Sequence, residues 1–262
     1  MPVRDCPRED RYASNVAPEL RACDLFSVTD TSSALEGATA VVISRAALVP
    51  PARFLQASRR ATQLFALDTV ARAARARGVT VHARSSGPEP RPAGVSPDAP
   101  EAGARVVRLA WQRRGAGVVS IQEMPARSET TAERALAHYL GFLPRLLRGA
   151  VDVRTSPDRV AFAIPHGPAL LAFRTSPARD ARRAVLSIEG GLLGRPAGGA
   201  FEFRVVSLES GETRLVVAVH GFMPRLPFPV YARTQARAHA RVMAAFASEW
   251  EGWCRAGGSI DR

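Results

Sequence analysis

One long apolar stripe close to the C-terminus constrains the fold more than any other feature of the sequence. From about Val230 to Trp253, large side chains and one histidine recur every three or four residues, which is the spacing of one helix face. They are His239, Val242, Met243, Phe246, Trp250 and Trp253. A stripe this long needs a broad apolar surface, and strands are predicted directly before it. The pattern therefore predicts an antiparallel sheet wrapped on a long C-terminal helix.

Residues 105–220 supply the strands for such a sheet. Apolar runs separated by turn residues predict them. The predicted strands span 105–111, 117–122, 150–155, 159–164, 169–174, 183–189, 200–208 and 213–220. Between the second and third of these, helical spacing predicts a helix over 128–147 with Ser128 or Thr130 as its N-cap. Residues 105–262 are therefore expected to form one α+β domain.

A proline-rich segment separates this part from the N-terminal part. Residues 85–104 hold five prolines, three glycines and no aromatic residue. Such a composition predicts an extended, mobile linker without helical or strand hydrogen bonding. The expected domains are 1–84, the linker 85–104, and 105–262.

The N-terminal part carries a different pattern. A β-branched run over 38–44 predicts a buried strand, an amphipathic stretch from about Arg53 to Arg77 predicts a helix ending at Gly78, and 79–83 predicts another strand. The handedness of such crossovers implies that the two strands are parallel. The expected fold class is an α/β fragment, an incomplete Rossmann-like β-α-β unit, followed by the α+β domain.

The charge composition excludes several chemistries. All 36 basic residues are arginine, and 24 acids leave a formal charge of +12. Without lysine there is no Schiff-base lysine, no P-loop lysine and no Tyr/Lys pair for carbonyl reduction. The arginines are dispersed along the chain, which favours a solvated surface over a nucleic-acid patch. We therefore do not expect nucleic acid to be a partner.

Cysteines and apolar runs bear on location and metal binding. Cys6, Cys23 and Cys254 lie far apart and form no C-x-x-C motif, and the five histidines have no recognisable metal spacing. The polar N-terminus does not resemble a secretion signal, and no apolar run is long enough for a membrane span. We expect a cytoplasmic protein without a metal site or membrane span.

Two parts of the chain resemble known families. Residues 21–86, which include CDLFSVTDTSSALEGATAVV and DTVARAARARGVTVHA, resemble an atypical extended short-chain dehydrogenase/reductase, an NAD(P)-binding, epimerase-like group. That family uses a glycine turn after its first strand and a Tyr/Lys pair. Here the first glycine is Gly37 and lysine is absent. This segment is therefore interpreted as a reductase remnant without redox activity, and no cofactor is predicted.

Residues 106–253 resemble the helix-grip superfamily, also called START or Bet v 1-like (SRPBCC). The matching stretches are RALAHYLGFLPRLL, IEGGLLGRPAGGAFEFR and HGFMPRLPFPVYARTQARAHARVMAAF. The resemblance implies an apolar cavity between the sheet and the C-terminal helix, and members of the superfamily bind hydrophobic small molecules.

Polar residues near the start of the last helix are the first candidate ligand-binding group. They are His220, Arg225, Tyr231, Gln235 and His239. In a helix-grip fold this junction borders the cavity mouth, so these groups could orient an apolar ligand. The alternative, which the sequence favours, is that Tyr231 and His220 only form hydrogen bonds that hold the start of the helix.

Glu202 and Arg204 form the second candidate group. They alternate with Phe201 and Phe203 along one predicted strand, so only one of the two sets can face inward. Alternation favours inward phenylalanines and a Glu/Arg pair on the surface. In the opposite orientation, the charged pair would anchor a ligand.

The leading functional hypothesis is the binding of a hydrophobic small molecule, without redox chemistry and with no catalytic residue assigned. One alternative is an NAD(P)-dependent oxidoreductase whose missing half comes from a partner or a longer start. Another is an interaction module or homo-oligomer that covers the incomplete N-terminal unit.

Overall fold

The computed structural model describes residues 18–44, 48, 50, 52, 54–84, 91–112, 117–177, 180–196 and 198–257. The chain divides into two compact units with interleaved segments. The first unit takes the described residues of Met1–Ala47, Thr69–Pro88 and Gly94–Gln112, and the second takes those of Leu48–Asp68, Glu89–Ala93 and Arg113–Arg262. Our expectations for residues 1–17, including Cys6, and for residues 85–90 of the predicted linker lie outside the described residues.

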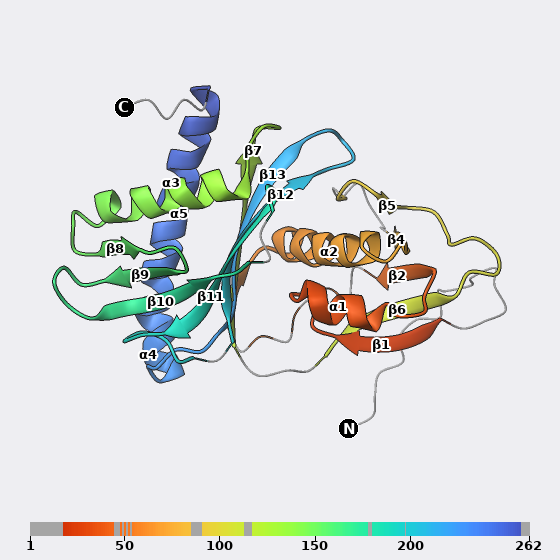
Figure 1. Cartoon of the computed structure of the whole chain (residues 1–262), viewed down its shortest axis with the longest axis horizontal. Helices are drawn as coiled ribbons and strands as arrows, with labels where there is room; N and C mark the ends of the chain where they lie inside the picture. The colour runs from red at the N-terminus through yellow and green to blue at the C-terminus, as the bar shows by residue number, and fades with distance from the viewer. Residues whose placement is uncertain are drawn as a thin grey trace. The chain divides into compact units, whose positions relative to one another are not determined.

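The first unit is built on a parallel sheet of five strands. In spatial order they are β1 (Glu19–Cys23), β6 (Val106–Trp111), β2 (Ala40–Ser44), β4 (Thr80–Arg84) and β5 (Val95–Ser96). All four neighbouring pairs are parallel. Helix α1 (Val28–Ala34) follows β1, and helix α2 (Arg59–Arg75) precedes β4 (Figure 1). The predicted parallel pairing of residues 38–44 with 79–83 is confirmed by β2 and β4.

Strand β6 corrects the expected organisation. The sequence predicted a strand over 105–111 in the C-terminal sheet, but β6 lies between β1 and β2. Apolar periodicity identifies a strand without identifying its hydrogen-bonding partners. The β-α-β unit is therefore not left as an isolated fragment, because β6 extends its sheet from beyond the proline-rich segment.

Part of the proline-rich segment also pairs. Val95 and Ser96 form β5 beside Val81 and His82 of β4, although we expected no strand there. The pairing is possible because β5 is a short edge strand, and edge positions tolerate neighbouring prolines.

The second unit is built on a sheet of eight strands. In spatial order they are β3 (Phe54–Ala57), β7 (Val118–Ala126), β13 (Thr213–Phe222), β12 (Ala200–Ser207), β11 (Arg183–Gly190), β10 (Ala169–Thr175), β9 (Arg159–Ala163) and β8 (Asp152–Thr155). All neighbours are antiparallel except β3 and β7. Strand β3 occupies residues that we predicted as the start of a helix from Arg53, which is why α2 begins only at Arg59.

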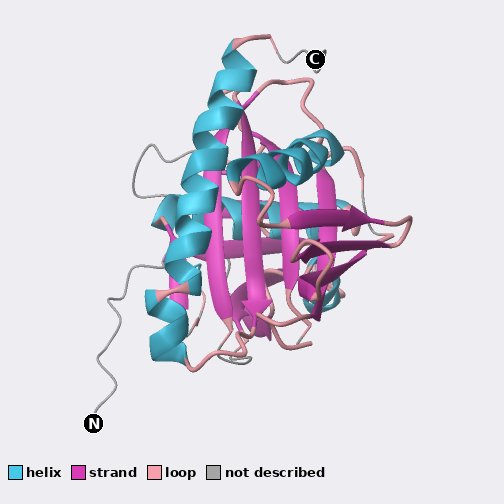
Figure 2. Ribbon diagram, turned by 90° about the vertical axis from the view of Figure 1, so that its left-hand side faces the viewer, coloured by secondary structure: helices cyan, strands magenta, loops and turns pink. Residues whose placement is uncertain are grey.

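Three helices complete the second unit. They are α3 (Ala132–Leu146), α4 (Phe228–Arg233) and α5 (Gln235–Arg255). Helix α3 is capped by Thr131, whose hydroxyl oxygen accepts a hydrogen bond from the Arg134 backbone N–H at 3.2 Å, rather than by Ser128 or Thr130. Figure 2 shows the long α5 running lengthwise alongside the long strands of the large sheet. The predicted α+β fold, with a large antiparallel sheet and a long C-terminal helix, is confirmed.

The core of the second unit lies between this sheet and helices α3 and α5. Phe201 and Phe203 of β12 and Tyr139 of α3 belong to it, together with Phe246 and Trp250 of α5. The Trp250 indole Nε1–H donates to the Pro125 carbonyl oxygen at 2.8 Å, which ties α5 to β7. Within the described residues, no helix combines the length and apolar character that a membrane crossing requires.

Candidate functional site

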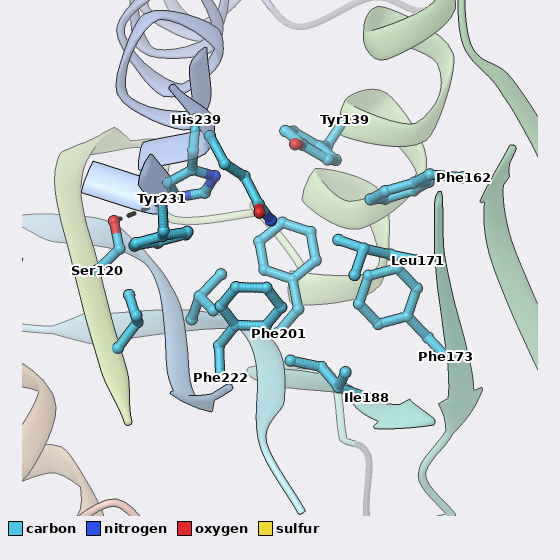
Figure 3. A pocket seen from close by; sticks show the side chains of 13 residues that line it. Ser120, Tyr139, Phe162, Leu171, Phe173, Ile188, Phe201, Phe222, Tyr231 and His239 are labelled. Carbon is cyan, nitrogen blue, oxygen red and sulfur yellow. Dashed lines mark hydrogen bonds between the residues drawn. The ribbon is translucent and has the colours of Figure 1, made fainter. Parts of the chain in front are cut away.

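A cavity of about 510 Å³, counting the space at its mouth, lies within the second unit (Figure 3). Of this space, about 70 Å³ is open to the centre of a water molecule. Thirteen side chains line it, and they come from six of the eight strands and from helices α3, α4 and α5. They are Val118, Ser120, Tyr139, Phe162, Leu171, Phe173, Ile188, Phe201, Val219, Phe222, Tyr231, Gln235 and His239.

The sheet forms an almost wholly apolar wall. Strand alternation sends every second residue to one face, so Phe201 of β12 and Val219 of β13, which are register partners, both reach the cavity. Phe162 of β9 and Phe173 of β10 meet with ring centroids 5.0 Å apart. Ser120 of β7 is the one polar residue that the described strands contribute to the lining.

The helices form the polar wall. Tyr139 comes from α3, Tyr231 from α4, and Gln235 and His239 lie one turn apart on α5. Figure 3 shows the hydroxyl end of Tyr139 pointing toward the side of the cavity where His239 lies. Hydrogen-bonding groups are therefore concentrated on the side opposite the aromatic sheet residues.

His239 and Ser120 join the two walls. His239 Nε2 lies 3.1 Å from Ser120 Oγ, which also accepts a hydrogen bond from the Gln122 side-chain amide at 3.4 Å. Burial lowers the pKa of His239 to about 4, because the imidazolium form loses its hydration. His239 is therefore neutral at pH 7 and acts in the cavity as a hydrogen-bonding group without charge.

Gln235 contributes a buried polar atom to the cavity, since its Oε1 has no hydrogen-bond partner among the described residues. Tyr139 and Tyr231, which also line the cavity, are each 3% exposed. Burial raises the pKa of Tyr139 above its ordinary value and that of Tyr231 to about 12. Both hydroxyls therefore stay protonated at pH 7 and can donate a hydrogen bond.

The predicted site residues divide between this cavity and two other places. Tyr231, Gln235 and His239 line the cavity. Arg225 does not line it, because its Nε donates to the backbone carbonyl oxygens of Gly191 at 2.7 Å and Gly194 at 3.3 Å. Arg225 instead holds the segment before α4 to the loop that follows β11.

Glu202, Arg204 and His220 lie on the opposite face of the large sheet. Phe201 and Phe203 face inward as the alternation favoured, but the charged pair is not on the surface, since both residues are 0% exposed. Arg204 Nη1 lies 3.2 Å from the Phe65 carbonyl oxygen and 3.2 Å from Asp68 Oδ2. Phe65 and Asp68, from the part of α2 that belongs to the second unit, thus cover this face, which a single strand's alternation could not reveal.

These charges form a compact network. Glu202 Oε1 accepts from Arg183 Nε at 2.5 Å and from Arg204 Nε at 2.6 Å, and Glu202 Oε2 lies 3.4 Å from His220 Nε2. Burial by itself raises the pKa of Glu202, but Arg204, His220 and Arg183 outweigh burial and hold that pKa well below its usual range. Glu202 is therefore ionised and its charge is matched inside the protein.

Sequence reasoning missed two polar residues of the cavity. Ser120 was predicted only as part of the strand over 117–122. Tyr139 was predicted only as one member of the apolar stripe of the helix over 128–147, which consists of Ala135, Leu136, Tyr139, Leu140, Leu143, Leu146 and Leu147. The sequence offered one usable signal, because Tyr139 is the only residue of that apolar stripe with a hydrogen-bonding group.

Metal ligation is not supported in the described part of the chain. There, no group of three or more His, Cys, Asp or Glu residues is placed to hold a metal ion. Cys23 and Cys254 are free thiols.

Comparisons with known proteins concern the fold alone. No protein-family model matches the chain, and no curated protein matches it. Similar solved structures include the Zhui aromatase/cyclase from Streptomyces sp. R1128, 17% identical, covering 54% of this chain and 99% of that one with a TM-score of 0.33. Ara h 8.0201 is 12% identical, with coverages of 51% and 99% and a TM-score of 0.32. A point mutant of norcoclaurine synthase from Thalictrum flavum, in complex with a transition-state analogue, is 12% identical, with coverages of 52% and 96% and a TM-score of 0.31. Because the sequence identities and TM-scores are low, the function has to be inferred from the cavity itself.

Proposed function

We propose that the second unit, a helix-grip domain, binds a hydrophobic small molecule in the cavity between the sheet and helices α3, α4 and α5. The observation that carries this proposal is the aromatic and aliphatic lining of the sheet wall. Ligand sites are typically concave and mostly apolar, with a few polar groups that orient the ligand. Tyr231, Gln235 and His239 are proposed for that orienting role, whereas Arg225, His220, Glu202 and Arg204 are proposed as structural.

A fluorescence titration tests this proposal. N-phenyl-1-naphthylamine is an uncharged dye that brightens in apolar surroundings, and the intact protein should bind it saturably. Leu171→Trp fills part of the cavity and should weaken binding at least about tenfold, which corresponds to about 1.4 kcal/mol. Leu170→Trp is the matched control, because the neighbouring leucine does not line the cavity, and it should change binding less than about twofold.

Two results would contradict the proposal. One is the absence of saturable dye binding to the folded wild-type protein. The other is equal loss of binding in the Leu171 and Leu170 variants, which would locate the dye away from the cavity.

We propose further that the reductase-like segment has no redox activity and binds no NAD(P). The support is the absence of lysine from the sequence and of glycine from residues 24–27, which join β1 to α1. Backbone amides of a glycine turn are what admit a dinucleotide pyrophosphate to the start of a helix. Titration with NADH and NADPH tests this, and saturable binding in the micromolar range would overturn it. The cytoplasmic location, and a protein partner or homo-oligomer formed through the N-terminal unit, stay predictions.

A further inference from the structure

The cavity has two chemically different walls. The sheet side presents the rings of Phe162, Phe173, Phe201 and Phe222, whereas the helix side presents the hydroxyls of two tyrosines, an amide and an imidazole. Aromatic side chains prefer offset-stacked or edge-to-face contact with other rings. The sheet wall therefore favours a flat aromatic body over a flexible chain.

The lining carries no charged group at pH 7. None of the residues that line the cavity is Asp, Glu or Arg, and the one titratable base, His239, is held neutral by burial. A carboxylate or ammonium moved into this space would lose its hydration without gaining an opposite charge, which costs several kcal/mol. The cavity therefore selects against ionised ligands.

The helix wall leaves complementary hydrogen-bonding capacity unused. Oε1 of Gln235 is buried and has no partner among the described residues, and the hydroxyl of Tyr139, another lining residue, is protonated and can donate. A buried polar group without a hydrogen-bond partner is energetically unfavourable. A ligand hydroxyl can satisfy both, since it accepts from the tyrosine O–H and donates to the amide oxygen.

We infer that the ligand is an uncharged, flat aromatic molecule with a hydroxyl on one edge, its rings against the sheet phenylalanines and its hydroxyl toward Tyr139 and Gln235. This inference rests on the proposed binding function and assigns the chemical class of its ligand. It also gives Tyr139 a specificity role that the sequence alone did not indicate.

Three naphthalene probes of nearly equal shape test the inference. Naphthalene has no polar edge, 2-naphthol adds an uncharged hydroxyl, and 2-naphthoate adds a carboxylate at pH 7. Each would be titrated against the full-length wild type, Tyr139→Phe and Gln235→Leu, with displacement of N-phenyl-1-naphthylamine as the readout. Tyr139→Phe breaks no hydrogen bond between described residues, so thermal melting should find it folded.

The expected pattern is selective. Wild type should bind 2-naphthol at least about fivefold more tightly than naphthalene, because one net hydrogen bond contributes about 1 kcal/mol. Tyr139→Phe and Gln235→Leu should each remove most of that difference while leaving naphthalene affinity within about twofold. Binding of 2-naphthoate should be the weakest of the three.

The failures are distinguishable. If naphthalene binds as tightly as 2-naphthol, or if both variants weaken the two probes equally, the ligand hydroxyl does not bind Tyr139 and Gln235. The proposal of binding in the cavity would still stand. If 2-naphthoate binds best, the selection for uncharged ligands is wrong. If no probe displaces the dye and the dye itself does not bind, the proposed function fails.

Discussion

Substitution of Glu202 by glutamine should destabilise the second unit strongly. The side chain is 0% exposed and lies 2.5 Å from Arg183 Nε and 2.6 Å from Arg204 Nε. Glutamine keeps the shape but removes the negative charge, so the two guanidinium groups face each other across a neutral amide. The 3.2 Å contact of Arg204 with Asp68 then remains as compensation. Removing one partner of a buried ion pair costs about 3–5 kcal/mol. We expect the free energy of unfolding to fall by an amount in that range.

Urea unfolding at pH 7, followed by tryptophan fluorescence and circular dichroism, measures the loss. Glu189→Gln is the matched control, since Glu189 Oε1 lies 2.8 Å from Arg174 Nε in an ion pair whose side chains are 28% and 57% exposed. Exposed ion pairs contribute about 1 kcal/mol or less. A loss below about 1 kcal/mol for Glu202→Gln, equal to that of the control, would refute the buried network.

The pH dependence gives a second check on Glu202. Its pKa is lowered in the folded state from an ordinary value of 4.5, so the stabilisation is fully present above pH 4.5. As the pH falls below 4.5, the unfolded chain takes up the proton first and the stabilisation is lost. The difference in the free energy of unfolding between wild type and Glu202→Gln should therefore become smaller below pH 4.5. A difference that grows as the pH falls would contradict the assignment of an ionised Glu202.

Two further predictions concern the cavity. Because burial lowers the pKa of His239 to about 4, the free energy of unfolding of the wild type should fall by at most about 3 kcal/mol as the pH drops from 6.5 toward 4. In urea titrations, His239→Gln should make the free energy of unfolding less dependent on pH over this range. An unchanged pH dependence in this variant would count against a buried neutral imidazole. Gly194→Ala should weaken dye binding, because its Cβ would lie 2.6 Å from Phe222 Cε2 and 3.1 Å from Leu171 Cδ2, both in the lining. Gly252→Ala, whose Cβ meets nothing within 4 Å, should leave dye binding unchanged, and equal effects would undermine the assignment.

Periodicity predicted individual elements of the second unit well. The strand predicted over 200–208 is β12 at Ala200–Ser207, and the stripe around Phe246 does face the sheet. Alternation within β12 was enough to orient Phe201 and Phe203, because it depends only on neighbouring residues.

The predictions that were wrong concern contacts between residues far apart in the sequence. Arg204 is buried by Asp68, which lies 136 residues earlier, so nothing near Arg204 signals its environment. Strand β6 finds its partners across the proline-rich segment for the same reason. The polar role of Tyr139 depends on the space that other side chains leave empty, which is set by packing and not by helical spacing.

Methyl NMR provides the most direct test of ligand binding in the cavity. Isoleucine occurs at only five positions, and Ile188 lines the cavity while Ile121 and Ile164 of the same unit and Ile43 of the other do not. The protein would be labelled at isoleucine methyl groups and titrated with 2-naphthol. We predict that the Ile188 methyl shifts saturably and shows intermolecular NOEs to the ligand ring, while Ile43 and Ile164 stay unchanged. An unmoved Ile188 signal at ligand saturation would contradict binding in this cavity.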